Sequence, residues 1–168
     1  MRPFKTIKSF LRHKDFEGFL AFVETEGIYE LEVGDENLLY RKAPLKWQKE
    51  LLSRVQPYSE SERLIFKNGN MDLILMLLEK HSVSEKNLVW GLENLDCKKL
   101  RSLVRKLPLI KSDAFEIALI TRRYEEAFRI WLERVDDLQP QAKELLRTGK
   151  RFKNLKQIYN RYYPLDPL

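Results

Sequence analysis

Hydrophobic residues recur along most of the chain at helical spacing. Met71, Ile74, Leu75 and Leu78 stand at positions i, i+3, i+4 and i+7, which places them on one face of a helix. Comparable apolar stripes begin at Phe16, Leu45, Cys97, Tyr124 and Phe152. The stripe at Leu45 is the weakest, because the residues after it are slightly out of register. The pattern predicts an all-α fold.

The stripes form a repeat, since successive ones begin 26 to 29 residues apart. A shorter apolar helix is expected to end about five residues before each stripe, with a polar turn between the two helices. Asp15, Asn70 and Asp96 should be N-caps of the longer helices, because a short side-chain oxygen accepts from free amides of the first turn. Pro44 suits a first helical turn, where its missing amide is not needed.

A single helix pair of this size cannot bury its apolar stripes alone, whereas stacked pairs bury them continuously. The sequence therefore predicts one solenoid of about six helix-turn-helix units. The expected single domain, residues 1–168, divides into approximate units 3–28, 35–58, 61–84, 87–112, 114–139 and 141–164.

Two segments depart from the helical pattern. Residues 28–33 alternate at period two and are expected to form an extended loop or a short strand before Gly34. The last residues cannot continue a helix past Pro164, and should either fold back over the last unit or trail free.

The third unit resembles an ankyrin repeat across its inter-helix turn and second helix, over residues 66–80. The family has a Gly-Asn or Gly-His turn there, followed by an acidic residue, aliphatic residues and a Leu-Leu pair. These places are filled here by Gly69, Asn70, Asp72, Ile74, Leu77 and Leu78.

Several ankyrin features are absent from this sequence. The bulky Ile65 and Phe66 replace the family's paired alanines, the Thr-Pro-Leu-His signature is missing, and the period is shorter than the usual thirty-three or so. The missing residues build the β-hairpin finger. The chain is therefore most similar to the degenerate, hairpin-poor ankyrin-like repeats of large DNA viruses and some intracellular bacteria. That resemblance implies stacked helix pairs that bind other proteins, without implying a particular partner.

Charge is distributed unevenly along the chain. The formal net charge is +6, with −2 over residues 1–97 and +8 over residues 98–168. An anionic partner should therefore meet the C-terminal part. The candidate partner-binding residues are basic side chains that flank core positions or lie in turns: Lys98, Lys99, Arg101, Arg105, Arg122, Arg123, Lys150, Arg151, Lys153 and Lys156. The alternative is that they only keep a repeat surface soluble.

The sequence carries no motif for catalysis, a cofactor or a metal. His13 and His81 are expected to be solvated surface residues, and paired acids such as Asp136-Asp137 to lie on a solvated face. Cys97 begins a stripe and is expected to be a buried, inert thiol. Most of Trp47, Trp90, Trp131, Tyr159 and Tyr162 should pack between repeats, with one or two as possible binding anchors.

These features predict a non-catalytic, cytoplasmic or otherwise intracellular adaptor or scaffold that binds another protein, with no cofactor and no membrane span. Host-cell cytoplasm is a candidate location, given the resemblance. Two alternatives use the same features: a nucleic-acid-associated protein that binds through the basic C-terminal part, and a structural component of a larger assembly such as a virus particle. The sequence leaves the oligomeric state open.

Overall fold

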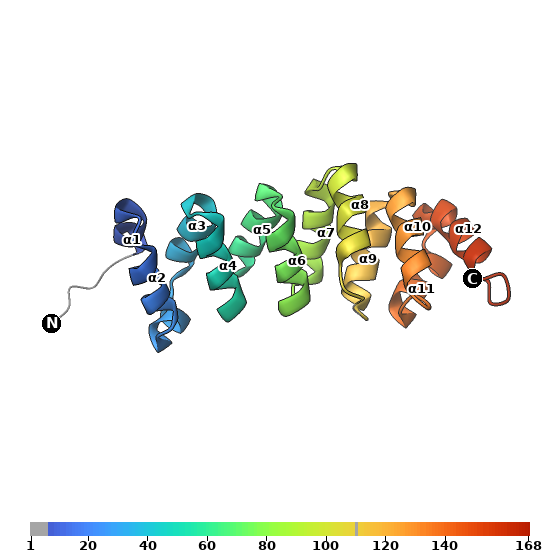
Figure 1. Cartoon of the computed structure of the whole chain (residues 1–168). Coiled ribbons are helices and arrows are strands. Elements are labelled where there is room, and N and C mark those ends of the chain that lie inside the picture. The colour runs from blue at the N-terminus through green and yellow to red at the C-terminus, as the bar shows by residue number, and fades with distance from the viewer. Residues whose placement is uncertain (1–6, 110) are drawn as a thin grey trace. The chain divides into compact units, whose positions relative to one another are not determined.

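The computed structural model describes residues 7–109 and 111–168. Over these residues the chain forms twelve α-helices and two short 3-10 helices, without a strand (Figure 1). The predicted all-α class is therefore confirmed. The chain divides into two compact parts, with the boundary between Ser82 and Val83. From here on, the part before the boundary is the first unit and the part after it is the second unit, whereas the predicted helix-turn-helix repeats are called pairs.

The first unit is built from three helix pairs. Its elements are α1 (Ile7–His13), α2 (Phe16–Val23), the 3-10 helix η1 (Glu26–Glu30), α3 (Val33–Lys42), α4 (Leu45–Arg54), α5 (Ser59–Asn68) and α6 (Met71–Lys80). Helix α3 packs against α1 and α5, and α4 packs against α2 and α6. The first helices of successive pairs thus form one row and the second helices form another.

The second unit repeats this arrangement. Its elements are α7 (Glu85–Asn94), α8 (Cys97–Lys106), α9 (Asp113–Arg122), α10 (Glu125–Arg134), α11 (Pro140–Thr148), the 3-10 helix η2 (Lys150–Phe152) and α12 (Lys153–Tyr162). Helix α9 packs against α7 and α11, while α10 packs against α8 and α12. Pairs therefore stack regularly within each unit. One continuous solenoid, and one domain over 1–168, stay predictions.

Short polar side chains begin the second helices as predicted. Asp15 Oδ1 accepts from the Gly18 amide at 2.9 Å, Asn70 Oδ1 from Leu73 at 3.2 Å, and Asp96 Oδ1 from Lys99 at 2.8 Å. Pro44 stands one residue before α4, not inside its first turn. Its fixed φ still suits the entry into a helix.

Two expectations about local structure need correction. The first helices are not consistently shorter: α3, α5, α7 and α9 have 10 residues each, like the second helices α4, α6, α8 and α10. Only α1, with 7 residues, and α11, with 9, are shorter than their partners α2, with 8, and α12, with 10. The polar first turns of α3, α5, α7 and α9 belong to the helix, so the apolar pattern alone placed the start of each helix too late. Of the residues 28–33 that were expected to form an extended loop or a short strand, 28–30 belong to η1, Leu31 and Glu32 are extended, and Val33 begins α3. No strand is present among the described residues to pair with this segment.

The C-terminal residues fold back on the last helix. The backbone amide of Leu168 donates to Asn160 Oδ1 at 2.7 Å, and Asn160 Nδ2 donates to the Leu168 carbonyl at 3.4 Å. Of the two courses predicted for the residues past Pro164, folding back and trailing free, the structure shows folding back.

Side chains from one pair cap the helix ends of the preceding pair. Asn68 Nδ2 donates to the Tyr40 carbonyl at the end of α3 at 2.8 Å, and Arg134 Nη1 donates to the Val104 carbonyl near the end of α8 at 2.5 Å. The last carbonyls of a helix have no partner inside it. Because each donor reaches back one pair, these bonds fix the register between neighbours.

Glu36, Glu62 and Glu116 are buried near the starts of first helices, and the hydrogen bonds of Glu36 and Glu116 link neighbouring pairs. Glu36 in α3 accepts from the backbone amide of Tyr58, which precedes α5, at 2.7 Å. Glu116 in α9 accepts from the backbone amide of Gln139, which precedes α11, at 2.6 Å, and from Trp131 Nε1 at 2.8 Å. Each of these two carboxylates therefore satisfies a helix-start amide of the next pair. Desolvation raises the pKa of both carboxyls above the ordinary value, although these hydrogen bonds oppose it.

Candidate interaction surfaces

All ten predicted basic residues lie in the second unit, and most reach solvent. Those classed as exposed are Lys98, Lys99, Arg105, Arg123, Lys150, Arg151 and Lys153, whereas Arg101, Arg122 and Lys156 are half-buried. They come from α8, from the junction of α9 and α10, from η2 and from α12. They do not all converge on one place.

Three of the predicted arginines surround one hollow. Arg122, Arg123 and Arg151 line a concavity of about 390 Å³, whose other lining residues include Glu125 and Asn154. Arg122 and Arg123 end the first helix of one pair, and Arg151 lies at the matching junction of the next. Stacking of the pairs therefore joins residues that are far apart in the sequence into one basic hollow.

Arg122 has a structural task inside this hollow. Its Nε donates to the Leu92 carbonyl at 3.1 Å, and its Nη2 donates to the Leu95 carbonyl at 3.3 Å. These bonds satisfy the end of α7. Arg122 is thus partly committed to packing, whereas the neighbouring Arg123 is exposed and holds a left-handed backbone conformation with φ of 55°.

Arg101 is already paired with an acid of the next helix pair. Its Nη1 lies 3.0 Å from Glu126 Oε1, and Glu126 Oε2 accepts from the Tyr124 hydroxyl at 2.9 Å. The hydrogen bonds from Arg101 and Tyr124 lower the pKa of Glu126. An anionic partner would have to compete with Glu126 for Arg101.

A larger groove lies in the first unit, where no candidate residue was predicted. Its volume is about 710 Å³. Apolar side chains line it: Leu11, Phe16, Leu38, Pro44 and Trp47. The remaining lining residues are all basic: Lys8, Arg12, Lys14, Lys42 and Lys46. We call these two sets the floor and the rim of the N-terminal groove.

Aromatic packing positions the floor. The Phe19 ring stacks on Trp47 with 4.8 Å between centroids, and Phe16 lies 5.8 Å from Trp47. Trp47 is only 2% exposed, whereas Phe16, Leu11 and Leu38 are half-buried. Trp47 therefore anchors α2 to α4, and the half-buried side chains present apolar surface to solvent. Lys46 Nζ sits 4.0 Å from the centre of the Phe16 ring, a cation-π contact.

The basic rim was not predicted from the sequence, because the net charge of a segment sums over all faces of its helices. Residues 1–97 carry −2 in total, so no basic site was expected there. The available signal was spacing: Lys8 and Arg12 are separated by four residues, as are Lys42 and Lys46. Helical spacing places Lys8 and Arg12 on one face of α1. Finding the groove also required knowing that the α1–α2 and α3–α4 junctions lie together.

Comparison of the chain with protein-family models, curated proteins and solved structures gives no match. Function therefore has to be argued from the chain's own surfaces. Within residues 7–109 and 111–168, no cluster of three or more His, Cys, Asp and Glu side chains is placed to hold a metal ion. No helix in the described part of the chain is long and apolar enough to cross a membrane.

The residues considered for chemistry differ from expectation in three places. Cys97 is exposed, because as the first residue of α8 it projects beyond the core stripe that begins at Leu100. His81 is half-buried, with Nε2 2.5 Å from the Leu52 carbonyl, so it is not a solvated surface histidine as expected. His13 is exposed as predicted.

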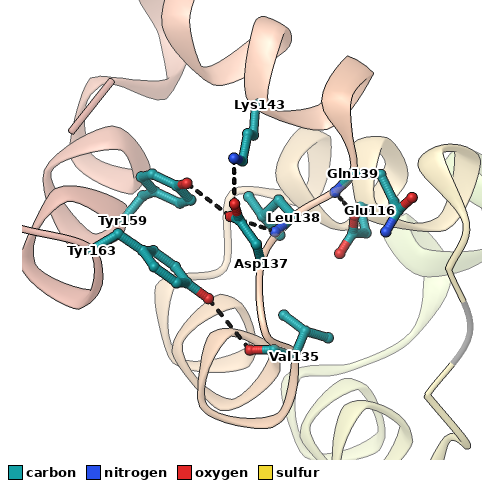
Figure 2. A network of polar contacts seen from close by, with 8 residues as sticks. All are labelled: Glu116, Val135, Asp137, Leu138, Gln139, Lys143, Tyr159 and Tyr163. Atoms are coloured by element: carbon teal, nitrogen blue, oxygen red, sulfur yellow. Dashed lines mark hydrogen bonds and ion pairs between the residues drawn. The ribbon is translucent and has the colours of Figure 1, made fainter. Parts of the chain in front are cut away.

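Asp137 is the third difference, since it belongs to a polar network and not to a solvated face. Figure 2 shows its carboxylate meeting Lys143 and the Tyr159 hydroxyl, with Glu116 and Tyr163 nearby. The Tyr159 hydroxyl donates at 2.8 Å, and so does the backbone amide of Leu138. Partial desolvation opposes ionisation of Asp137, but the hydrogen bonds from Lys143, Tyr159 and Leu138 prevail and lower its pKa. The network joins the α10–α11 connection to α12.

Proposed function

We propose that this protein is a non-catalytic adaptor or scaffold, built from ankyrin-like helical repeats, that binds another protein. The observation that carries the proposal is the N-terminal groove, whose floor offers Leu11, Phe16 and Leu38 to solvent within a concavity of about 710 Å³. Concave apolar surface with charged margins is typical of binding sites. The regular stacking of helix pairs in each unit supports the resemblance to repeat proteins whose role is recognition.

The same proposal covers location and origin. Degenerate ankyrin-like repeats of large DNA viruses and intracellular bacteria are the repeats that this sequence most resembles. We therefore propose the cytoplasm, including that of a host cell, as the place where the adaptor works.

Affinity capture with the full chain tests the adaptor function. A binding partner should be retained by the wild type, lost with Leu38→Asp in the groove floor, and retained with Leu109→Asp. Leu109 is the matched control because it is an exposed leucine, at 57%, in the other unit. The partner must then bind the purified chain with a defined stoichiometry. Equal capture by all three proteins would contradict a role for the groove.

A second candidate function is nucleic-acid association through the basic C-terminal part. The specific observation in its favour is the hollow that gathers Arg122, Arg123 and Arg151. Residues 83–168 carry a formal charge of +6, whereas residues 1–82 are neutral. Such a surface suits phosphates.

Anisotropy of a labelled DNA or RNA duplex, titrated at about 50 and about 200 mM salt, tests this second function. Contacts to six or more phosphates should weaken binding by roughly a thousandfold between those salts. The variant Arg123→Glu/Arg151→Glu should abolish binding, and Arg122 is left unchanged because it caps α7. No binding at the lower salt would leave these residues as surface charge alone.

A further inference from the structure

We infer that the N-terminal groove binds an acidic amphipathic segment of another protein, with apolar side chains on the floor and carboxylates at the rim. The inference rests on the proposed adaptor function and names the chemistry of the partner. It concerns only the first unit, so it does not depend on the basic hollow of the second.

The floor selects apolar side chains. Two of its half-buried contributors, Leu11 and Leu38, are aliphatic, and Phe16 supplies an aromatic ring. Trp47 lies behind them with almost no accessible surface. Because the depression is held by the Phe19–Trp47 stack, it is preformed, and a ligand would spend little free energy on ordering it.

The rim selects negative charge. All five charged residues that line the groove are cations, and no carboxylate lines it. In the described part of the chain, none of these five cations forms an ion pair with a carboxylate. The nearest acid in sequence, Asp15, is turned toward the Gly18 amide as the cap of α2. Asp15 and Glu17 both line a neighbouring hollow that shares Lys14, Phe16 and Lys46 with the groove.

The apolar floor and the basic rim together favour one kind of ligand over the others that could occupy the groove. A nucleic acid would neutralise the rim, but it would leave the aliphatic floor uncovered, and Trp47 offers no free face for base stacking. The chain's own first six residues include Arg2 and Lys5 and no acid, so their charge matches the rim instead of complementing it. A peptide with both carboxylates and large apolar side chains satisfies both surfaces.

An unbiased peptide selection tests the inference. A random peptide library displayed on phage is selected against the immobilised full-length chain, and recovered peptides are synthesised with a fluorescent label for anisotropy titration. The expected result is enrichment of peptides that combine Asp or Glu with Leu, Phe, Trp or Ile. Their binding should weaken as salt rises from about 50 to about 500 mM, because rim charges are solvent-exposed.

Two matched charge variants locate the site. Lys42→Gln/Lys46→Gln removes two rim charges and should weaken peptide binding about tenfold, as expected for losing close charge pairs. Lys67→Gln/Lys80→Gln removes two exposed charges elsewhere in the first unit and should change it less than about twofold. Leu38→Asp should abolish binding through the floor. Circular dichroism checks that each variant is folded, and the lysine pairs test the site even if Leu38→Asp does not fold.

The outcomes separate this inference from the adaptor function. Enrichment of neutral or basic peptides overturns the inference, as does acidic-peptide binding that the rim variant leaves unchanged. Peptides that bind outside the groove would still support an adaptor. Recovery of no binding peptide at all overturns the inference, and equal partner capture by the wild type and Leu38→Asp independently overturns the groove's role in the adaptor. A labelled oligonucleotide that loses affinity in the rim variant would assign the groove to nucleic acid instead.

Discussion

At the scale of single residues, buried carboxylates connect one helix pair to the next. Glu36 and Glu116 each accept from a backbone amide that precedes the following first helix. Glu62, 26 residues after Glu36, is buried at the equivalent place in α5. A backbone amide left without a partner in the interior is costly. The carboxylates are therefore structural, and their burial by itself does not indicate catalysis.

The pH dependence of stability should reveal the burial of Glu116. Desolvation raises the pKa of its carboxyl, so folding favours the protonated form. Its contribution to stability is full below the unfolded pKa and falls as pH rises through the folded pKa. The free energy of unfolding of Glu116→Gln minus that of the wild type should therefore be larger at pH 7 than at pH 4, as measured by urea denaturation.

Asp137→Asn is the control with the opposite sign. Hydrogen bonds overcome desolvation and lower the pKa of Asp137, so its contribution is present above the unfolded pKa and falls as pH drops through the folded pKa. Relative to the wild type, Asp137→Asn should lose more stability at pH 7 than at pH 3. The same pH trend in both variants would contradict the assignment.

Two adjacent arginines should affect stability in opposite directions. Arg122→Met removes the donors that cap α7 and should lower the free energy of unfolding by about 1 kcal/mol. Arg123→Gly relieves the left-handed conformation at φ of 55° and should raise it by up to about 1 kcal/mol. Thermal denaturation of both variants measures the effects. If Arg122→Met is as stable as the wild type, Arg122 does not stabilise α7, and only a binding role remains for it.

At the scale of elements, capping explains where the helices begin and end. Asp15, Asn70 and Asp96 could be identified from the sequence because N-capping depends on a side chain and amides three residues away. Ser84 and Ser112 cap α7 and α9 in the same way, with bonds of 3.3 and 3.2 Å. Caps made by the next pair, as by Asn68 and Arg134, could not be identified, because the donor lies 28 to 30 residues from its acceptor.

Loss of one N-cap should be measurable. Asp96→Ala removes the bond to the Lys99 amide and should lower the free energy of unfolding by about 0.5–2 kcal/mol. The neighbouring Cys97→Ala is the control, because Cys97 is exposed and its replacement should change stability by less than about 0.5 kcal/mol. Urea denaturation compares the two. A destabilised Cys97→Ala protein would indicate that the thiol is packed after all.

At the scale of the whole molecule, each unit has its own core. Leu100 is fully buried in the second unit, whereas Leu109 on the same unit is 57% exposed. Within each unit a helix pair contacts mainly its neighbouring pairs, so stability there is distributed along the chain and not concentrated in one centre.

Hydrogen exchange should show this local dependence. Leu100→Ala leaves a cavity in the core and should cost about 2–5 kcal/mol. Exchange of backbone amides should accelerate more within residues 83–168 than within residues 7–82, as mass spectrometry of peptic fragments would show. Leu109→Ala should leave both regions close to the wild type. Uniform acceleration in Leu100→Ala would mean that the chain unfolds as one cooperative block.

The sequence by itself determined the helical class, most starts of the second helices, and a period close to 27 residues between pairs. These are consequences of local physics: apolar spacing on one helix face and short polar caps act over a few residues. It also identified the exposed basic residues of the second unit, because Lys and Arg beside a core stripe project outward.

Only the tertiary structure decided which of those residues meet and which are free. Stacking gathers Arg122, Arg123 and Arg151 in one hollow, commits Arg122 to α7, and pairs Arg101 with Glu126. It also creates the N-terminal groove from two junctions about 30 residues apart, and exposes Cys97 at a helix start. Contacts between pairs depend on how neighbouring helices pack, and neither net charge nor periodicity records that packing.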